Sequence, residues 1–104
     1  MNNSFSVSYK GYRIQLSNRA KKSIQKFPPK DRLALLDKLD LLLSRTDSLD
    51  IKKLMAYDNL YRVRSGDYRI IYKLDTAKKT IIVLLVAHRK EVYKLLNMLA
   101  HLMD

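Results

Sequence analysis

The fold is constrained most strongly by residues 61–93, where the sequence alternates and then becomes uniformly apolar. Tyr61 and Val63 are separated by Arg62, and Arg64 follows, which is the period-two pattern of a strand with one apolar and one basic face. A second alternating segment comes after a short break, and a run of apolar residues comes after that. The pattern predicts a β-hairpin followed by a third strand, so this part of the chain must form a sheet.

The turn of the predicted hairpin fixes its register. If Gly66 and Asp67 form a two-residue loop, with glycine first as a type II′ turn requires, Arg64 lies directly opposite Arg69. Arginines that face each other across a sheet repel and reduce its stability. We therefore interpret this face as a binding site for an anion. The same register pairs the apolar side chains, Val63 with Ile70 and Tyr61 with Tyr72.

The third predicted strand, Thr80–Ala87, is apolar almost throughout. A strand without a polar face is buried on both sides, so we expect it to be central in the sheet. His88, Arg89 and Lys90 follow directly at its C-terminal end. Together with the hairpin arginines they predict one basic surface suited to phosphate groups.

Two helices are predicted in the N-terminal half, after a first short strand at Tyr12–Leu16. Ser17 is a good N-cap for a helix that runs to about Lys26. Pro28 ends this helix, and Pro29 suits the first turn of a second helix that continues to about Ser44. Leucines repeat along the second helix at helical spacing: Leu33, Leu36, Leu39 and Leu43. We interpret them as the core stripe of an αα-hairpin on one face of the sheet; the alternative is a zipper-like dimer face.

A final helix is predicted from about Lys90 to Leu102, with apolar residues on one side: Val92, Leu95, Leu96, Leu99 and Leu102. The segment Thr46–Asn59 has no clear period and is interpreted as a connection. We expect one α+β domain over residues 1–104, in the order β-α-α-β-β-β-α, with residues 1–10 as a flexible leader. Its sheet would be four-stranded and mainly antiparallel, with the αα-hairpin on one face and the last helix at the C-terminus.

The chain is strongly basic. Its formal net charge is +11, divided as +5 over residues 1–50 and +6 over residues 51–104, so the charge belongs to the domain and not to a tail. Such a field attracts polyanions, either nucleic acid or an acidic protein. The alternative is that the lysines serve only solubility.

Several classes of protein are excluded or disfavoured. The absence of cysteine excludes disulfides and thiolate metal sites, and two separated histidines without a tight acidic cluster predict no metal site. We expect no other cofactor. The longest apolar run, Ile81–Ala87, is far shorter than the roughly 20 residues that span a bilayer. The N-terminal residues lack the apolar run of a signal peptide, so we expect a cytoplasmic protein without membrane contact.

The order and spacing of these motifs resemble a known family. The run LYRVRSGDYRIIYKLD, followed by IIVLLVAHRKEVYKLL, is similar to the RelE side of the RelE/ParE superfamily of bacterial toxin–antitoxin toxins. The similarity extends from Gly11 to about Leu96, and the motifs follow a helical hairpin of suitable length in the sequence. It implies a small toxin that cuts messenger RNA in the ribosomal A site and is neutralised by an antitoxin, which the basic charge predicts to be acidic.

The resemblance also suggests which residues act. Cleavage without a metal needs charge stabilisation on the phosphorane, and the planar, permanently charged guanidinium donates to two phosphate oxygens. Arg69 and Arg89 match the catalytic arginines of the family pattern. Tyr93 lies four residues beyond Arg89, where it can stack on a base or offer its hydroxyl. Solvated strand arginines and a boundary tyrosine are the alternatives.

The remaining candidates lie around this pair. Arg64 is assigned to the catalytic set and Arg62 to flanking phosphates; other family members have lysine at these positions, so the identity of the general base stays open. We also assign Lys53 and Lys73 to contacts with RNA. His88 is the histidine nearest the cluster, and either contacts RNA or makes a structural hydrogen bond.

Three functions are compatible with the sequence. The first is a ribosome-dependent endoribonuclease. The second is a ParE-like toxin that inhibits DNA gyrase by protein contact, a branch that shares the fold but usually lacks the full set of arginines and tyrosine. The third is a non-catalytic RNA-binding module, which would be expected to show an aromatic stacking platform.

Overall fold

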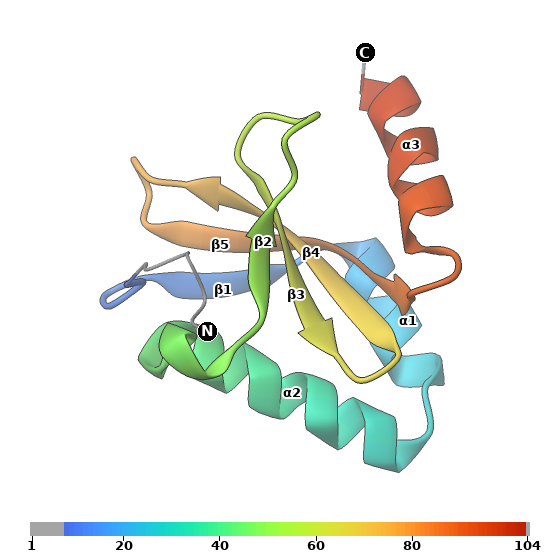
Figure 1. Ribbon diagram of the computed structural model, residues 1–104, viewed down its shortest axis with the longest axis horizontal. Helices are drawn as coiled ribbons and strands as arrows, with labels where there is room; N and C mark the ends of the chain where they lie inside the picture. Colours follow the sequence, from blue (N-terminus) through green and yellow to red (C-terminus); the bar gives the residue numbers. More distant parts are fainter. Residues whose placement is uncertain (1–7, 104) are drawn as a thin grey trace.

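The computed structural model describes residues 8–103 and folds them into three helices around one mixed sheet (Figure 1). The strand order is β1-β5-β4-β3-β2, in which β1 runs parallel to β5 and all other neighbours are antiparallel. The elements are β1 (Arg13–Leu16), α1 (Asn18–Lys26), α2 (Pro29–Ser44), a 3-10 turn (Thr46–Ser48), β2 (Ile51–Lys53), β3 (Leu60–Ser65), β4 (Tyr68–Asp75), β5 (Thr80–His88) and α3 (Val92–Met103).

The α+β class is confirmed, but the sheet has five strands and not four. The additional strand, β2, lies in the segment that was interpreted as a connection, and it pairs antiparallel with β3. It is only three residues long, and Ile51 is its one buried side chain. The two lysines that follow give no alternation, so the pattern was too short to detect.

The expected position of the apolar strand is close to the observed one. β5 lies between β1 and β4, so it has a neighbour on both sides, although β4 is the middle strand of the five. Its side chains pack in both directions. Val83 and Val86 join the core on the side of α1 and α2, whereas Leu85 and Ala87 join the core beneath α3.

The predicted hairpin register is confirmed. Arg64 pairs with Arg69, Val63 with Ile70 and Tyr61 with Tyr72. Gly66 has φ +59° and begins the two-residue loop, as a type II′ turn requires. The turn therefore determines which side chains of β3 and β4 face each other.

The first helix follows its capping signals. The side chain of Ser17 accepts a hydrogen bond from the backbone N–H of Ala20, and Ala20 and Ile24 are buried. In α2 the predicted stripe is partly wrong, because Leu35, Leu39 and Leu42 are buried whereas Leu33 and Leu36 are 68% and 42% exposed. Leucine occurs on both sides of α2, so spacing alone could not identify the buried side.

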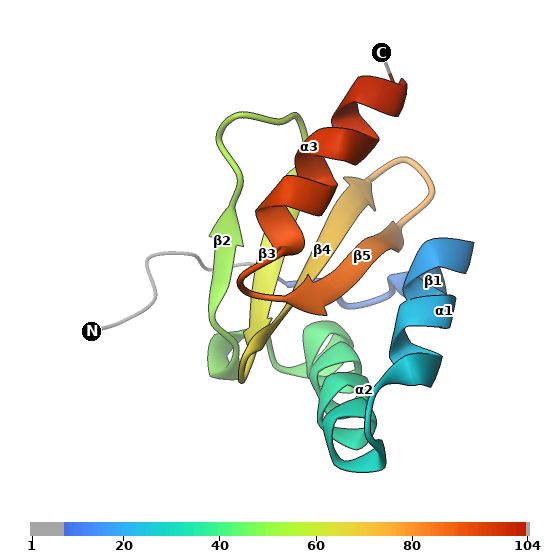
Figure 2. The ribbon, with the colours of Figure 1, turned by 90° about the vertical axis from the view of Figure 1, so that its right-hand side faces the viewer.

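The helices cover the two faces of the sheet unequally. Figures 1 and 2 show α2 and α3 on opposite sides of it. The larger core lies toward α1 and α2, and the smaller one lies between α3 and the sheet. The smaller core contains Leu60, Ile71, Leu85, Ala87, Val92 and Leu96. No helix among the described residues has the length and apolar character needed to cross a membrane.

Residues 1–7 of the expected leader lie outside the described residues. Of the three that follow, Tyr9 is buried at 4% exposure, and its hydroxyl lies 2.8 Å from the hydroxyl of Tyr72. Tyr9 thus belongs to the larger core. In the last helix, the expected apolar side chains Val92 and Leu96 are buried; the side chain of Leu102 lies outside the described part of the chain.

Candidate functional site

Four arginines and one tyrosine gather on the face of the sheet that carries α3. We call this group, Arg62, Arg64, Arg69, Arg89 and Tyr93, the arginine cluster. Burial, followed by the positive charges of Arg62, Arg64 and Arg89, lowers the pKa of Arg69, whereas Tyr93 opposes that shift. Arg64 pairs directly with Arg69 across the ladder, and Arg62 lies two residues away on the same face of β3. Arg89 and Tyr93 are near enough to influence the charge of Arg69. Arg69 lies at the centre.

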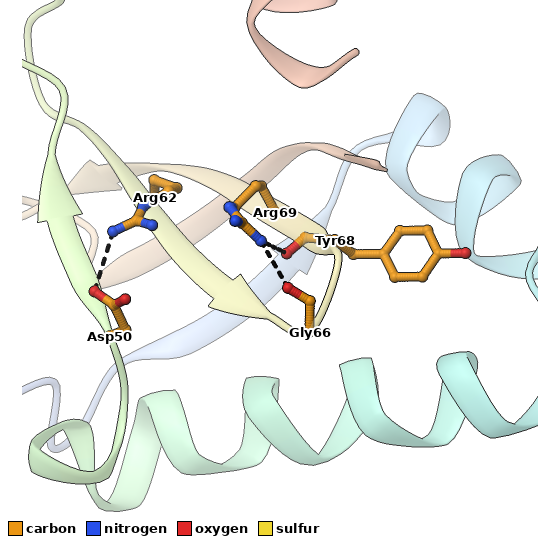
Figure 3. A network of polar contacts seen from close by, with 5 residues as sticks. All are labelled: Asp50, Arg62, Gly66, Tyr68 and Arg69. Carbon is orange, nitrogen blue, oxygen red and sulfur yellow. Dashed lines mark hydrogen bonds and ion pairs between the residues drawn. The ribbon is translucent and has the colours of Figure 1, made fainter. Parts of the chain in front are cut away.

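Arg69 is anchored to the hairpin turn. Its Nη1 donates to the backbone carbonyls of Gly66 and Tyr68 at 2.8 and 2.9 Å (Figure 3). These two bonds hold one corner of the guanidinium and leave Nε and Nη2 for a ligand. The side chain of Tyr68 extends in the opposite direction, toward α1 and α2. The turn thus separates a basic side of the hairpin from an aromatic side.

Arg89 reaches the same turn from the end of β5. Its backbone N–H donates to the carbonyl of Asp67 at 2.7 Å, and its Nε lies 3.5 Å from Oδ1 of Asp67. More than half of its side chain is exposed. Arg69 belongs to β4 and Arg89 follows the end of β5, yet both are oriented by residues of one turn.

Arg62 is brought to the cluster, but it is buried. Only 7% of it is exposed, and its Nη2 lies 3.1 Å from Oδ1 of Asp50 (Figure 3). Its buried Nε has no hydrogen-bond partner among the described residues. Because it is buried, the guanidinium of Arg62 is better placed to add positive potential to the cluster than to contact a ligand directly.

Asp50 contacts two members of the arginine cluster, which the sequence did not reveal. Besides pairing with Arg62, its backbone carbonyl accepts a hydrogen bond from the N–H of Arg64 at 3.1 Å. It therefore fixes two members of the cluster from the residue before β2. The signal was missed because β2 itself was not predicted. Arg64 is exposed, as a residue that contacts a ligand should be.

Tyr93 occupies the first turn of α3 and is 46% exposed. A short connection between β5 and α3 precedes it. There the N–H of Glu91 donates to the carbonyl of His88 at 2.9 Å. The exposed ring is available to a planar group that approaches the arginines.

Two predicted residues lie on the other face of the sheet. His88 pairs with Tyr68 across the ladder and contacts the edge of its ring at 5.9 Å between centroids. Its Nδ1 accepts a hydrogen bond from the N–H of Lys90 at 3.1 Å, which is the structural alternative considered above. Lys53 pairs with Tyr61, which packs against the larger core, so the structure does not bring it to the cluster.

Lys52 takes the place expected for Lys53. It pairs with Arg62 and therefore shares the face of the cluster. Lys73 lies on this face too, but farther along the sheet, opposite Leu60. It lines a pocket of about 300 Å³ beneath α3, together with apolar residues of the sheet and the helix: Leu60, Leu84, Leu96 and Leu99.

The arrangement suits a phosphodiester. Four guanidinium groups supply charge and directional donors, and only two carboxylates, Asp50 and Asp67, form ion pairs with them among the described residues. Within residues 8–103 no three histidine or acidic side chains gather as metal ligands would. The charge at this place comes from arginine.

Comparison with known proteins agrees with the motif order. The model of the family described as "ParE toxin of type II toxin-antitoxin system" matches residues 14–93. The toxin RelG of Mycobacterium tuberculosis is 27% identical over 85 residues, which are 80% of this chain and 97% of that protein. The toxin RelE3 of Methanocaldococcus jannaschii is 49% identical over 45 residues, or 43% of this chain and 49% of that protein.

Solved structures give the same result. RelE in the RelE–RelB complex of Pyrococcus horikoshii has 30% identity and a TM-score of 0.65, with 75% of this chain and 94% of that chain covered. The intact RelBE complex of E. coli has 28% identity and a TM-score of 0.62, with coverage of 75% and 96%. The chain therefore belongs to the RelE/ParE family of toxins from type II toxin–antitoxin systems.

Proposed function

We propose that this toxin is an endoribonuclease that cleaves messenger RNA in the ribosomal A site. The observation that carries the proposal is the convergence of Arg69 and Arg89 on one hairpin turn, with Arg64 and Tyr93 exposed beside them. Among the relatives, those named RelE or RelG support this branch of the family. The proposed cleavage takes place in the cytoplasm, where messenger RNA is translated.

The proposed reaction needs no metal. The 2′-oxygen of the ribose attacks the adjacent phosphorus and loses its proton, and the bond to the 5′-oxygen of the next nucleotide breaks. The leaving oxygen takes up a proton, so the products are a 2′,3′-cyclic phosphate and a 5′-hydroxyl. Negative charge increases on the phosphorane oxygens, and fixed guanidinium donors stabilise it without reorganisation.

Each side chain of the cluster has a proposed role in this step. Arg69 and Arg89 donate to the phosphorane, and Arg64 assists from the facing strand. Arg62 is held away from solvent by Asp50 and raises the positive potential around Arg69. Tyr93 stacks on a base splayed from the message or reaches its phosphate. Lys73 and Lys52 would contact flanking RNA, whereas Lys53 lies on the other face of the sheet.

The proposed partner is an acidic antitoxin. A cluster of arginines on a chain of net charge +11 binds anionic protein segments as well as RNA. The structural relatives were solved with RelB antitoxins, which supports a partner of the same kind. A short chain that folds as it binds can cover the cluster and contact or displace α3. Co-expression with the neighbouring acidic reading frame should give a stoichiometric complex and protect the cells.

The decisive experiment is a purified translation reaction to which the protein is added. Mapping of new 5′ ends should find cuts inside codons, with the Arg69→Ala variant as the inactive control. The second candidate is gyrase inhibition, which we keep because the matching family model is described as a ParE toxin. Inhibition of gyrase supercoiling by a protein that leaves the message intact would establish that candidate and refute the first.

A further inference from the structure

The hairpin turn holds both proposed catalytic arginines, and it does so by different means. Arg69 donates to the carbonyl of Gly66 at 2.8 Å. Arg89 is fixed twice by Asp67, through its backbone N–H at 2.7 Å and through its Nε at 3.5 Å from Oδ1. A two-residue loop thus sets the separation of two side chains that come from β4 and from the end of β5.

We propose that Asp67 is a positioning residue for Arg89 and that Gly66 is the backbone position that keeps the turn in register. The proposal rests on the proposed function, because it assigns how the arginines of that site are oriented. Asp67 occupies the Nε side of the Arg89 fork. Within residues 8–103 no hydrogen bond or ion pair engages the edge formed by the two Nη groups of Arg89. It is this edge that can bind two oxygens of one phosphate.

A carboxylate at this place is unfavourable for binding alone. Asp67 is 70% exposed beside the cluster, so its negative charge repels an incoming phosphate. Orientation of Arg89 is the contribution that offsets this repulsion, because a misplaced donor costs most in the transition state. Substitution of Asp67 should therefore strengthen the binding of RNA while slowing its cleavage.

The role of Gly66 can be separated from simple packing. It has φ +59°, and a Cβ placed there would meet nothing within 4 Å, so alanine would act only by straining the backbone. Gly11 has φ +85° and an equally open Cβ position, but it lies before β1, at the end of the sheet opposite to the hairpin turn. Gly11→Ala is the matched control for Gly66→Ala.

The first test is Asp67→Asn, measured by single-turnover cleavage on programmed ribosomes. We expect the maximal rate to fall about threefold to fivefold, the range of an exposed ion pair. The toxin concentration that gives half of the maximal rate should fall as well. Asp47→Asn is the control, since Asp47 is 77% exposed and pairs with Arg45 at 3.6 Å, so it changes the net charge equally. It should leave the rate unchanged.

The second test is a double-mutant cycle with Arg89→Lys, which keeps the charge but removes Nε. If Asp67 acts through Arg89, Asp67→Asn should have no further effect on the rate in the Arg89→Lys background. Independent, multiplicative losses would overturn the proposal. So would an unchanged rate for Asp67→Asn, or a loss of rate accompanied by weaker binding.

The glycine pair tests the turn as a whole. Gly66→Ala and Gly11→Ala should lower the melting temperature similarly, but only Gly66→Ala should reduce the rate, by about tenfold. Equal rates for the two variants would refute the role of the turn.

A readout without catalysis keeps the inference apart from the proposed function. In nitrogen-15 spectra the Nε–Hε signal of Arg89 should shift in Asp67→Asn and not in Asp47→Asn; an unmoved signal would overturn the positioning role. If the signal shifts as expected but Arg89→Ala cleaves normally, the proposed site is wrong and the contact is only structural.

Discussion

The two faces of the sheet differ in what covers them. The face toward α1 and α2 carries a continuous apolar core, in which Leu35, Tyr72 and Val83 are fully buried. The opposite face is divided: one end packs beneath α3, and the other holds facing arginines. Figure 2 shows α3 over one part of this face, with the turn between β3 and β4 outside it. Stability is thus concentrated on one face, and a destabilising charge cluster is tolerated on the other.

The difference explains how the arginines can remain together. Arg64 and Arg69 face each other across the ladder, and Arg62 is buried beside Lys52 of the neighbouring strand. Each such contact costs free energy. Burial on the face toward α1 and α2, here called the covered face, must offset this cost. Two carboxylates relieve the repulsion at the margins, Asp50 at the edge of the sheet and Asp67 at the turn. Among the described residues no carboxylate forms an ion pair with Arg69 at the centre, so its charge is available to an anion.

The largest expected effect lies on the basic face. Arg69→Ala and Arg89→Ala should each reduce cleavage by about 10²–10³, or on the order of 3–4 kcal/mol, because each removes a donor to the phosphorane. Growth arrest should be lost while the melting temperature is kept or raised. Expression assays and thermal unfolding measure both. If both variants fold and still arrest growth fully, the basic face is not the active one.

The covered face should respond in the opposite way. Leu35→Ala opens a cavity in the larger core and should lower the free energy of unfolding by about 2–5 kcal/mol. Leu33→Ala on the same helix, 68% exposed, should change it by less than about 0.5 kcal/mol. Urea titration compares the two variants. Equal losses would show that α2 uses another face than the one described.

Substitutions of Tyr93 test whether the first turn of α3 takes part in the site with the arginines. Tyr93→Ala should cost about 1–3 kcal/mol in cleavage if its ring stacks on a base. Tyr93→Phe keeps the ring and should cost less. Single-turnover rates on programmed ribosomes separate the two variants. Equal losses would assign the role to the hydroxyl group.

The smallest effect concerns the pH dependence of the covered face. Burial raises the pKa of Tyr72 and of Tyr9 above the ordinary value of 10.0, so the folded protein favours their neutral forms. Their contribution is complete below about pH 10 and is lost as the pH rises, by at most about 1.4 kcal/mol per pH unit for each tyrosine. Between pH 9 and 11 the free energy of unfolding should fall less steeply with pH in Tyr72→Phe than in the unmutated protein. Parallel profiles would contradict this assignment.

Much of the fold followed from local patterns. The alternation around Val63 and the loop at Gly66 determined a register that the structure confirms, because a strand has period two and a two-residue turn allows one pairing. Ser17 marked the start of α1, and the paired prolines marked the end of α1 and the start of α2, for equally local reasons. In α2, where leucine occurs on both sides, the pattern misassigned Leu33 and Leu36.

The sequence by itself determined that two arginines face each other and that a third follows the last strand, because these relations depend on pairing and chain order. Only the tertiary structure decided which neighbours reach them. A three-residue edge strand buries Arg62 against Asp50 and places Lys52, not Lys53, on the basic face. The last strand directs His88 to the face covered by α1 and α2. Asp67 fixes Arg89 at the turn that also anchors Arg69. These contacts join residues far apart in the chain, and such contacts form only when the sheet is assembled.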